Sequence, residues 1–125
     1  MKLATWNVNS IRARETRLID FLAAQAPDVV CLQELKVTNE SFPFDAIRAA
    51  GYCAAVHGQK TYNGVAILAR SEPADVEKGM GDGDPQARLI SARAFGVRVL
   101  SAYFPNGGEV GNLICKLKGT LRAPR

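Results

Sequence analysis

Residues 2–8 (KLATWNV) and residues 27–33 (PDVVCLQ) decide the fold, because each is a mainly apolar and β-branched run of strand length. Between them, Ser10 can act as the N-cap of a helix, and residues 18–22 place apolar side chains at helical spacing. The second run has the nearly continuous apolar character of a strand that is buried on both faces. Strand, helix and strand in this order predict one crossover unit.

The rest of the chain alternates short elements with turns that are rich in Gly, Pro and Asp. The pattern predicts, in order, a helix at 44–50 closed by Gly51, strands at 52–56 and 64–69, a long loop at 71–85, and a hairpin of 86–94 with 97–104 that turns at Phe95-Gly96. A few helices and many strands, antiparallel after residue 50, predict an α/β (α+β) fold in which two sheets are flanked by helices.

The composition suits one compact domain with a substantial core, since the 125 residues are 47% hydrophobic. The formal net charge is +4 and the isoelectric point is about 9.2. This charge fits a polyanionic partner such as DNA, although many soluble proteins carry the same charge without binding nucleic acid. The charge therefore supports other indications of DNA binding and establishes nothing alone.

The cysteines give no sign of a disulfide framework. Cys31, Cys53 and Cys115 are odd in number and too widely spaced for a zinc knuckle, and Cys31 lies in an apolar run, where it is expected to be a small buried hydrophobe. Met1-Lys2 leads directly into a predicted strand, and the sequence shows neither a signal peptide nor a transmembrane run. We expect a protein of the reducing cytoplasm with no membrane partner.

Polar side chains follow the predicted strands at the points where the strands end. Asn7 and Asn9 come at the end of the first strand, and Glu34 directly follows the second. Hard oxygen donors of this kind are the ligands that Mg²⁺ prefers, so the strand ends predict a magnesium site. A solvent-facing glutamate at a strand end is an equally open interpretation on the residues alone. Tyr103 and Asn106 add a phenol and an amide at the end of a later strand.

Four runs of this sequence, TWNVNSIRAR, VVCLQELK, YNGVAIL and SAYFPNGG, resemble the exonuclease III branch of the endonuclease/exonuclease/phosphatase superfamily. They occur in the family's order over about residues 1–110. The resemblance implies half of a four-layer α/β sandwich, with two mainly antiparallel sheets flanked by helices. It also implies a DNA-repair hydrolase, an abasic-site endonuclease with 3′-to-5′ exonuclease activity, that uses Mg²⁺ with Mn²⁺ as a substitute. The partner would be double-stranded DNA with abasic sites or 3′ ends, and the full-length form would be a monomer.

By this resemblance, Asn7 matches the metal-site asparagine of a Trp-Asn motif, and Glu34 matches the metal-binding glutamate of a Gln-Glu motif. Tyr103 and Asn106 match a catalytic Tyr-x-Pro-Asn motif. The tyrosine would donate a hydrogen bond or transfer a proton, and the asparagine would donate to a phosphate oxygen. Each residue also has a simpler interpretation, because Asn favours strand-end turns and a tyrosine before a turn can belong to the core.

Five further residues are candidates for contact with DNA or phosphate: Asn9, Arg12, Lys36, Tyr62 and Asn63. Lys36 follows Glu34 by two positions, so both would face one side if the chain stays extended. An aromatic beside an amide, as at Tyr62 and Asn63, can contact a sugar or a base. Solvated charge explains Arg12 and Lys36 almost as well, and an Asn-Gly pair is also typical of a hairpin turn.

The match to the family stops near residue 110. Residues 111–125 form a basic stretch that does not align with the helix that the resemblance implies there, and we expect a divergent tail produced by a truncation or a shift of reading frame. The Gly-Asp-x-Asn and Asp-His motifs that would supply the catalytic base are absent from the sequence, and neither His57 nor the pair Asp82 and Asp84 fits them. We therefore predict that this polypeptide alone is inactive or nearly so.

Three functions remain open from the sequence. They are a DNA-repair nuclease, a phosphatase of the same superfamily that acts on small phosphate esters, and a non-catalytic remnant that binds DNA weakly through Lys and Arg. The basic charge and the segments QELK and YFPNG favour DNA over small esters, whereas the absent motifs favour the remnant. A dinucleotide-binding fold of the Rossmann type is disfavoured, because no GxGxxG follows the first strand.

Overall fold

The structure is a computed structural model that describes residues 1–79 and 86–104, and residues 112–118 as backbone. Its elements are, in chain order, β1 (Leu3–Asn7), α1 (Ile11–Gln25), β2 (Val29–Gln33), the 3-10 helix η1 (Asn39–Ser41), α2 (Phe44–Ala49), β3 (Cys53–His57), β4 (Val65–Ala69), β5 (Ala74–Lys78), β6 (Leu89–Ala94), β7 (Val97–Phe104) and β8 (Asn112–Lys118). The described strands form two four-stranded sheets, ordered β1-β2-β4-β3 and β5-β6-β7-β8.

The first sheet contains the parallel pair that positions the candidate site. β1 and β2 run parallel, with Asn7 opposite Gln33, and α1 makes the crossover between them. The β2–β4 and β4–β3 pairs are antiparallel. Every residue of β2 and of β4 is buried, as expected for central strands covered on both faces. Because β1 and β2 are parallel, their carboxyl ends lie at the same edge of the sheet.

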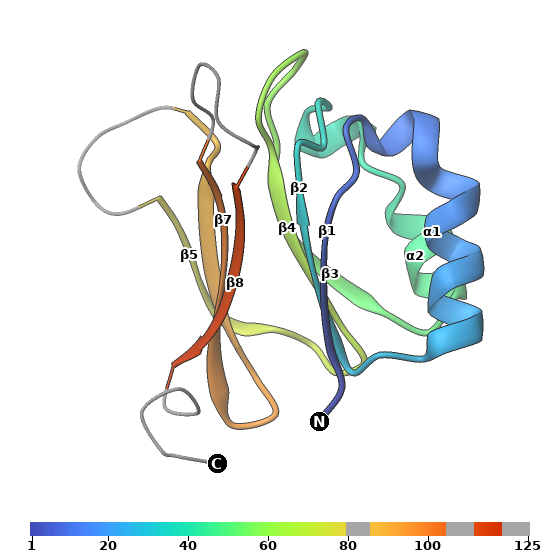
Figure 1. Cartoon of the computed structure of the whole chain (residues 1–125), viewed down its shortest axis with the longest axis vertical. Helices are drawn as coiled ribbons and strands as arrows, with labels where there is room; N and C mark the ends of the chain where they lie inside the picture. Colours follow the sequence, from blue (N-terminus) through green and yellow to red (C-terminus); the bar gives the residue numbers. More distant parts are fainter. Residues whose placement is uncertain (80–85, 105–111, 119–125) are drawn as a thin grey trace.

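The local sequence explains where α1 begins and ends. The Ser10 hydroxyl accepts a hydrogen bond from the Ala13 amide (3.4 Å), as the predicted N-cap should. The helix ends two residues before Pro27, which cannot continue it. Leu18 and Leu22 are buried in the core between the helices and the first sheet. Figure 1 shows α1 and α2 together on one face of that sheet, which confirms the predicted crossover unit.

The second sheet packs on the face of the first sheet that the helices leave free, so the described chain has three layers (Figure 1). Buried apolar residues from both sheets fill the space between them: Val29, Cys31, Ala55, Val65, Ile67, Ala69, Ile90, Ala92, Ala94 and Val99. The predicted α/β fold with two mainly antiparallel sheets is confirmed, with the described helices on one side. The predicted hairpin also forms, as β6 and β7, with Ala94 opposite Val97.

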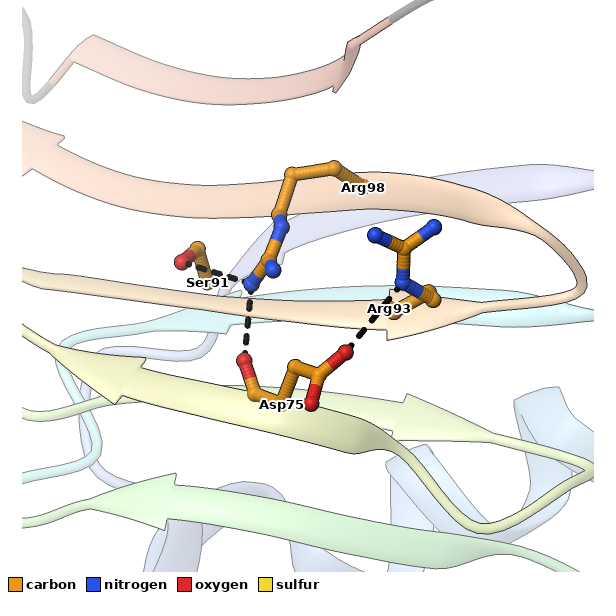
Figure 2. A network of polar contacts seen from close by, with 4 residues as sticks. All are labelled: Asp75, Ser91, Arg93 and Arg98. Carbon is orange, nitrogen blue, oxygen red and sulfur yellow. Dashed lines mark hydrogen bonds and ion pairs between the residues drawn. The ribbon is translucent and has the colours of Figure 1, made fainter.

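The strand β5 corrects the prediction of a loop over residues 71–85. All of its residues are exposed, so its sequence (ADVEK) lacks the apolar alternation that marks a half-buried strand. Its pairing with β6 also contains a register shift. Figure 2 shows how β5 is attached: Asp75 accepts a hydrogen bond from Arg93 through its carboxylate (3.3 Å) and one from Arg98 through its backbone carbonyl (2.7 Å). Charged, irregular strands of this kind are typical of sheet edges.

The backbone of β8 differs from the expectation for the end of the chain. It pairs antiparallel with β7, with Asn112 opposite Phe104, and so forms a strand where the resemblance implied a helix. The edge of a sheet supplies backbone hydrogen bonds to any extended segment, and this pairing does not depend on an apolar pattern. The division of the chain near residue 110 stays a prediction.

The structure bears on two further expectations, the state of the cysteines and the absence of membrane-spanning helices. Cys31 is buried as predicted, but it is disulfide-bonded, so the expectation that no cysteine is paired is wrong. Cys53 is a free thiol. The expected reducing compartment therefore loses the support that it drew from cysteine usage. Among the described residues, no helix has both the length and the apolar character needed to cross a membrane.

Candidate metal and phosphate site

The carboxyl ends of β1 and β2 stay joined beyond the last residue of each strand. The amide of Val8 donates to the carbonyl of Gln33 (3.0 Å), and the amide of Ser10 donates to the carbonyl of Glu34 (2.8 Å). The predicted ligands Asn7 and Glu34 thus come from neighbouring strands at one edge of the sheet. The sequence reasoning that placed them together is supported by this geometry, although their roles remain proposals.

A continuous chain of polar contacts links these strand ends. The amide of Asn9 donates to Oδ1 of Asn7 (3.0 Å), and Nζ of Lys36 donates to Oδ1 of Asn9 (2.6 Å). The same Nζ lies 3.9 Å from Oε2 of Glu34. Because Tyr103 in turn hydrogen-bonds to Glu34, five predicted residues lie in one group. We call Asn7, Asn9, Glu34, Lys36 and Tyr103 the strand-end cluster.

The backbone after β2 is not extended, which corrects the reason given for placing Lys36 beside Glu34. Both residues have positive φ angles, 60° and 57°, in the left-handed region that non-glycine residues rarely adopt. Between them, Leu35 is fully buried and anchors the segment. The amide of Leu35 donates to the carbonyl of Gly64 (3.1 Å), and the amide of Lys36 donates to the carbonyl of Asn63 (3.0 Å). Strained conformations that are fixed in this way cluster at functional sites.

Tyr103 reaches the cluster from the second sheet. Burial raises the pKa of Tyr103 above its ordinary value of 10.0, and the Glu34 carboxylate raises that pKa further through its charge and its hydrogen bond. Gln33 links β2 to β7 through a buried hydrogen bond, because its Nε2 donates to Oγ of Ser101 (3.0 Å). Oγ of Ser101 in turn donates to the carbonyl of Leu32 in β2 (3.1 Å). This buried polar bridge lies one residue from Glu34 and two from Tyr103.

Arg88 is a neighbour of the cluster that the sequence reasoning missed. Its carbonyl accepts a hydrogen bond from the amide of Tyr103 (2.8 Å), and its positive charge lowers the pKa of Tyr103, opposing the larger effects of burial and Glu34. Nε of Arg88 is buried without a hydrogen-bond partner among the described residues. The signal was present in the predicted hairpin, since a turn at Phe95-Gly96 continues the register to Arg88 opposite Tyr103.

The remaining predicted residues lie outside the cluster. The side chain of Tyr62 is exposed, and Arg12 is exposed in the first turn of α1. Asn63 is buried, and its Nδ2 donates to Oε1 of Gln59 (3.1 Å), so its amide supports the loop instead of facing solvent. Its backbone carbonyl is the part that contacts the cluster. Asn106, Asp82 and Asp84 lie outside the described residues.

Gly64 explains why this loop can approach so closely. Its φ is +95°, and a Cβ added there would lie 2.9 Å from Cβ of Leu35. Only glycine combines this backbone conformation with the close contact. The Asn63-Gly64 pair, which precedes β4, therefore holds the segment from Glu34 to Lys36 in place. The sequence alone had allowed either a structural role or a DNA contact for this pair.

The donor set of the cluster fits a hard divalent cation. Amide and carboxylate oxygens at Asn7 and Glu34 are the types of ligand that Mg²⁺ takes. Within residues 1–79 and 86–104, no three His, Cys, Asp or Glu side chains gather into a denser metal site. An ion held here would complete its coordination with water or phosphate oxygens, as Mg²⁺ commonly does.

An open pocket of about 560 Å³ lies elsewhere, between β1 and α1. Its lining residues are Thr5, Trp6, Arg17, Asp20, Phe21 and Ala24. None of them belongs to the strand-end cluster. A volume alone does not make a site, and the residues that line this pocket are not among the predicted site residues.

Comparison with known proteins decides the family. The model of the endonuclease/exonuclease/phosphatase family matches residues 4–110. The chain belongs to this family. Within the family it is 39% identical over 113 residues to exodeoxyribonuclease III of Haemophilus influenzae, covering 86% of this chain and 42% of that relative.

Two solved structures of the family extend the comparison. The 3′ phosphatase NExo from Neisseria, bound to a product DNA hairpin, is 47% identical with a TM-score of 0.80 and covers 82% of this chain and 41% of its own. An AP endonuclease from Archaeoglobus fulgidus is 43% identical with a TM-score of 0.78 and covers 82% and 40%. The chain thus spans about two fifths of the length of these family members.

Proposed function

We propose that the strand-end cluster is the metal-holding and phosphate-holding part of a DNA-repair phosphodiesterase, an abasic-site endonuclease with 3′-to-5′ exodeoxyribonuclease activity. One observation carries the proposal: parallel β1 and β2 bring Asn7 and Glu34 to one edge, where Tyr103 and Lys36 meet the Glu34 carboxylate. The family members that act on DNA, by their names, support the substrate class.

Asn7 and Glu34 would hold Mg²⁺, or Mn²⁺ in its place. A bound ion of this kind supplies a Lewis acid that polarises the phosphate and stabilises the leaving oxygen. Glu34 provides the single negative charge of the described cluster. Asn7 keeps its oxygen oriented because Oδ1 already accepts the Asn9 amide (3.0 Å).

Tyr103, Lys36 and Arg88 would hold the phosphate. Because the pKa of Tyr103 is raised above 10.0, the side chain remains a phenol at neutral pH and can donate a hydrogen bond to a phosphate oxygen. Lys36 adds positive charge beside Glu34, and Arg88, whose buried Nε has no hydrogen-bond partner among the described residues, adds positive charge near Tyr103. Donors placed where negative charge builds up stabilise the transition state. Asn106 stays a proposed donor on the strength of its motif.

DNA with abasic sites or 3′ ends is the proposed partner, bound by a monomer. The net charge of +4 supports a polyanion, and Arg12 and Tyr62 are exposed and free to contact it. Binding of this type should weaken steeply as salt is raised, because phosphate contacts release counterions. We also propose that the 125-residue polypeptide alone cuts DNA poorly, since its sequence lacks the motifs of the catalytic base.

A chimeric enzyme allows the proposed metal site and the predicted inactivity of the 125-residue chain to be tested separately. Residues 1–110 would replace the matching stretch of the Haemophilus exodeoxyribonuclease III, and duplex DNA with one abasic site would be incubated with Mg²⁺ or EDTA. We expect Mg²⁺-dependent nicking by the chimera, lowered about a thousandfold by Glu34→Gln. The 125-residue chain should leave the same DNA intact.

Three results would contradict parts of the proposal. A folded chimera that cuts equally well with glutamine at position 34 would remove Glu34 from the chemistry. Nicking of abasic DNA by the 125-residue chain alone, above the level of its Glu34→Gln variant, would refute the predicted inactivity. An excess of p-nitrophenyl phosphate hydrolysis over DNA cutting would favour a phosphatase for small esters.

A further inference from the structure

Lys36 places a positive charge where a metal ion would also be attracted. Its Nζ lies 2.6 Å from Oδ1 of Asn9 and 3.9 Å from Oε2 of Glu34. The side chains of Lys36 and Glu34 are only 32% and 21% exposed, so water screens their attraction incompletely. A flexible surface lysine would not be expected to lie between two oxygens of the cluster.

The backbone directs Lys36 to this position. Its φ is 60°, and its amide is held by the carbonyl of Asn63 at 3.0 Å, while the adjacent Leu35 is fully buried. A non-glycine residue pays conformational strain in the left-handed region, and it stays there only if its surroundings fix it. The segment is therefore built so that the ammonium faces Glu34 and Asn9.

We propose that Lys36 is an internal counter-ion of the cation site. It holds the Glu34 carboxylate and the Asn9 amide in place in the metal-free protein, and it gives up Glu34 when a divalent cation binds. The inference rests on the proposed function, because that function assigns Glu34 to the metal. Lys36 and the metal ion are antagonists at Glu34, because Lys36 keeps the site assembled and lowers its affinity for the ion.

The antagonism follows from charge. Glu34 is the one acidic side chain of the strand-end cluster, and its charge is shared with an ammonium already 3.9 Å away. A divalent cation on the same carboxylate meets repulsion from that ammonium, and it must displace the lysine or bind beside it. This repulsion acts whether or not Lys36 also contacts a phosphate.

The test is a titration of the 125-residue chain with Mn²⁺, in which electron paramagnetic resonance measures the free ion without DNA. The variants are Lys36→Met, which keeps the apolar stem, and Lys36→Asn, which tolerates the left-handed backbone. Arg93→Met is the matched control, because it removes one positive charge on the outer face of the second sheet (Figure 2). Circular dichroism and thermal melting check that each variant is folded.

We expect both Lys36 variants to bind Mn²⁺ about tenfold more tightly than the unchanged chain, from the loss of a like charge near the ion. Arg93→Met should change the affinity less than about twofold, because its charge is exposed and screened. Equal or weaker Mn²⁺ binding by folded Lys36→Met and Lys36→Asn would overturn the inference.

A Glu34→Gln variant distinguishes this failure from failure of the proposed function. If Glu34→Gln loses Mn²⁺ binding while the Lys36 variants gain nothing, the metal assignment stands and the counter-ion does not. If Glu34→Gln binds Mn²⁺ like the unchanged chain, or if no form of the chain binds it, the metal assignment fails and the counter-ion inference falls with it.

Discussion

Two ion pairs in this molecule have similar separations but differ in how exposed their side chains are. On the outer face of the second sheet, Nε of Arg93 lies 3.3 Å from Oδ2 of Asp75, and the two side chains are 52% and 63% exposed (Figure 2). At the ends of β1 and β2, Nζ of Lys36 lies 3.9 Å from Oε2 of Glu34, and both side chains are about half as exposed. The shorter pair is the one in water.

The difference shows that proximity is a poor guide to importance. An exposed ion pair contributes about 0–1 kcal/mol, and Asp75 with Arg93 and Arg98 serves mainly to join the bulged edge strand β5 to its neighbours. The Glu34 carboxylate lies farther from its lysine, and it interacts with Tyr103 as well as with the Lys36 ammonium. The proposed metal site rests on this shared carboxylate and not on the exposed one.

The largest expected effect is on Mn²⁺ affinity, when the charge of Glu34 is removed and compared with removal of the charge of Asp75. Glu34→Gln should weaken Mn²⁺ binding by about 100-fold, since the variant loses the one negative charge of the strand-end cluster, a loss at the upper end of that seen for ligand supports. Asp75→Asn should leave the affinity within about twofold. Isothermal titration calorimetry compares the two, and similar losses in both would erase the distinction between the pairs.

The next effect concerns the polar bridge beneath the cluster. Gln33→Leu should lower the free energy of unfolding by about 2 kcal/mol, because Oγ of Ser101 and Oγ1 of Thr5 lose a buried donor. Ser91→Ala in the outer-face network should change it by less than about 0.5 kcal/mol. Urea denaturation measures both, and a Ser91→Ala loss as large as that of Gln33→Leu would contradict the role of burial.

Tyr103 gives a prediction in pH. Its pKa is raised above 10.0 in the folded protein, chiefly by burial and then by Glu34, so the folded state keeps the phenolic proton after the unfolded state has lost it. The resulting stabilisation is complete below about pH 10 and is lost as the pH rises further. Spectrophotometric titration of the phenolate should show that Glu34→Gln lowers the pKa of Tyr103. An unchanged pKa of Tyr103 in Glu34→Gln would show that Tyr103 and Glu34 do not interact.

The smallest effect is expected at the exposed pair itself. Asp75→Asn should change the free energy of unfolding by less than about 0.5 kcal/mol, because water and salt already screen the pair. Asn also tolerates the positive φ of 50° at this position. Thermal melting at low and high salt measures the difference. A loss above about 1 kcal/mol that salt does not reduce would show that the outer pair is structurally important.

Much of the fold could be predicted because its signals are apolar. β1, β2 and the hairpin of β6 with β7 carry apolar runs or alternation, and the strand-helix-strand order implied that Asn7 and Glu34 would meet. β5 could not be found in this way, since all of its residues are exposed. Backbone pairing at a sheet edge needs no apolar pattern. β5 is attached to β6 in this way, and β8 is attached to β7.

Within the candidate site, the strand ends were predictable and the side-chain contacts were not. Spacing alone suggested that Lys36 would face Glu34 through an extended chain, whereas two left-handed residues achieve it. That conformation depends on Gly64 and Leu35 packing from another strand, which a local pattern does not encode. Arg88 could have been placed from the hairpin register opposite Tyr103, and its buried Nε required the three-dimensional structure.

Paramagnetic broadening by Mn²⁺ tests most directly whether the ends of β1 and β2 form the cation site. In the nuclear magnetic resonance spectrum of the isotope-labelled chain, substoichiometric Mn²⁺ should first broaden the signals of Asn7, Asn9, Glu34 and Lys36, and leave those of Asp75 and Arg93 sharp. Broadening that is centred on the outer-face pair, or that is absent from the strand ends, would contradict a metal site at Glu34.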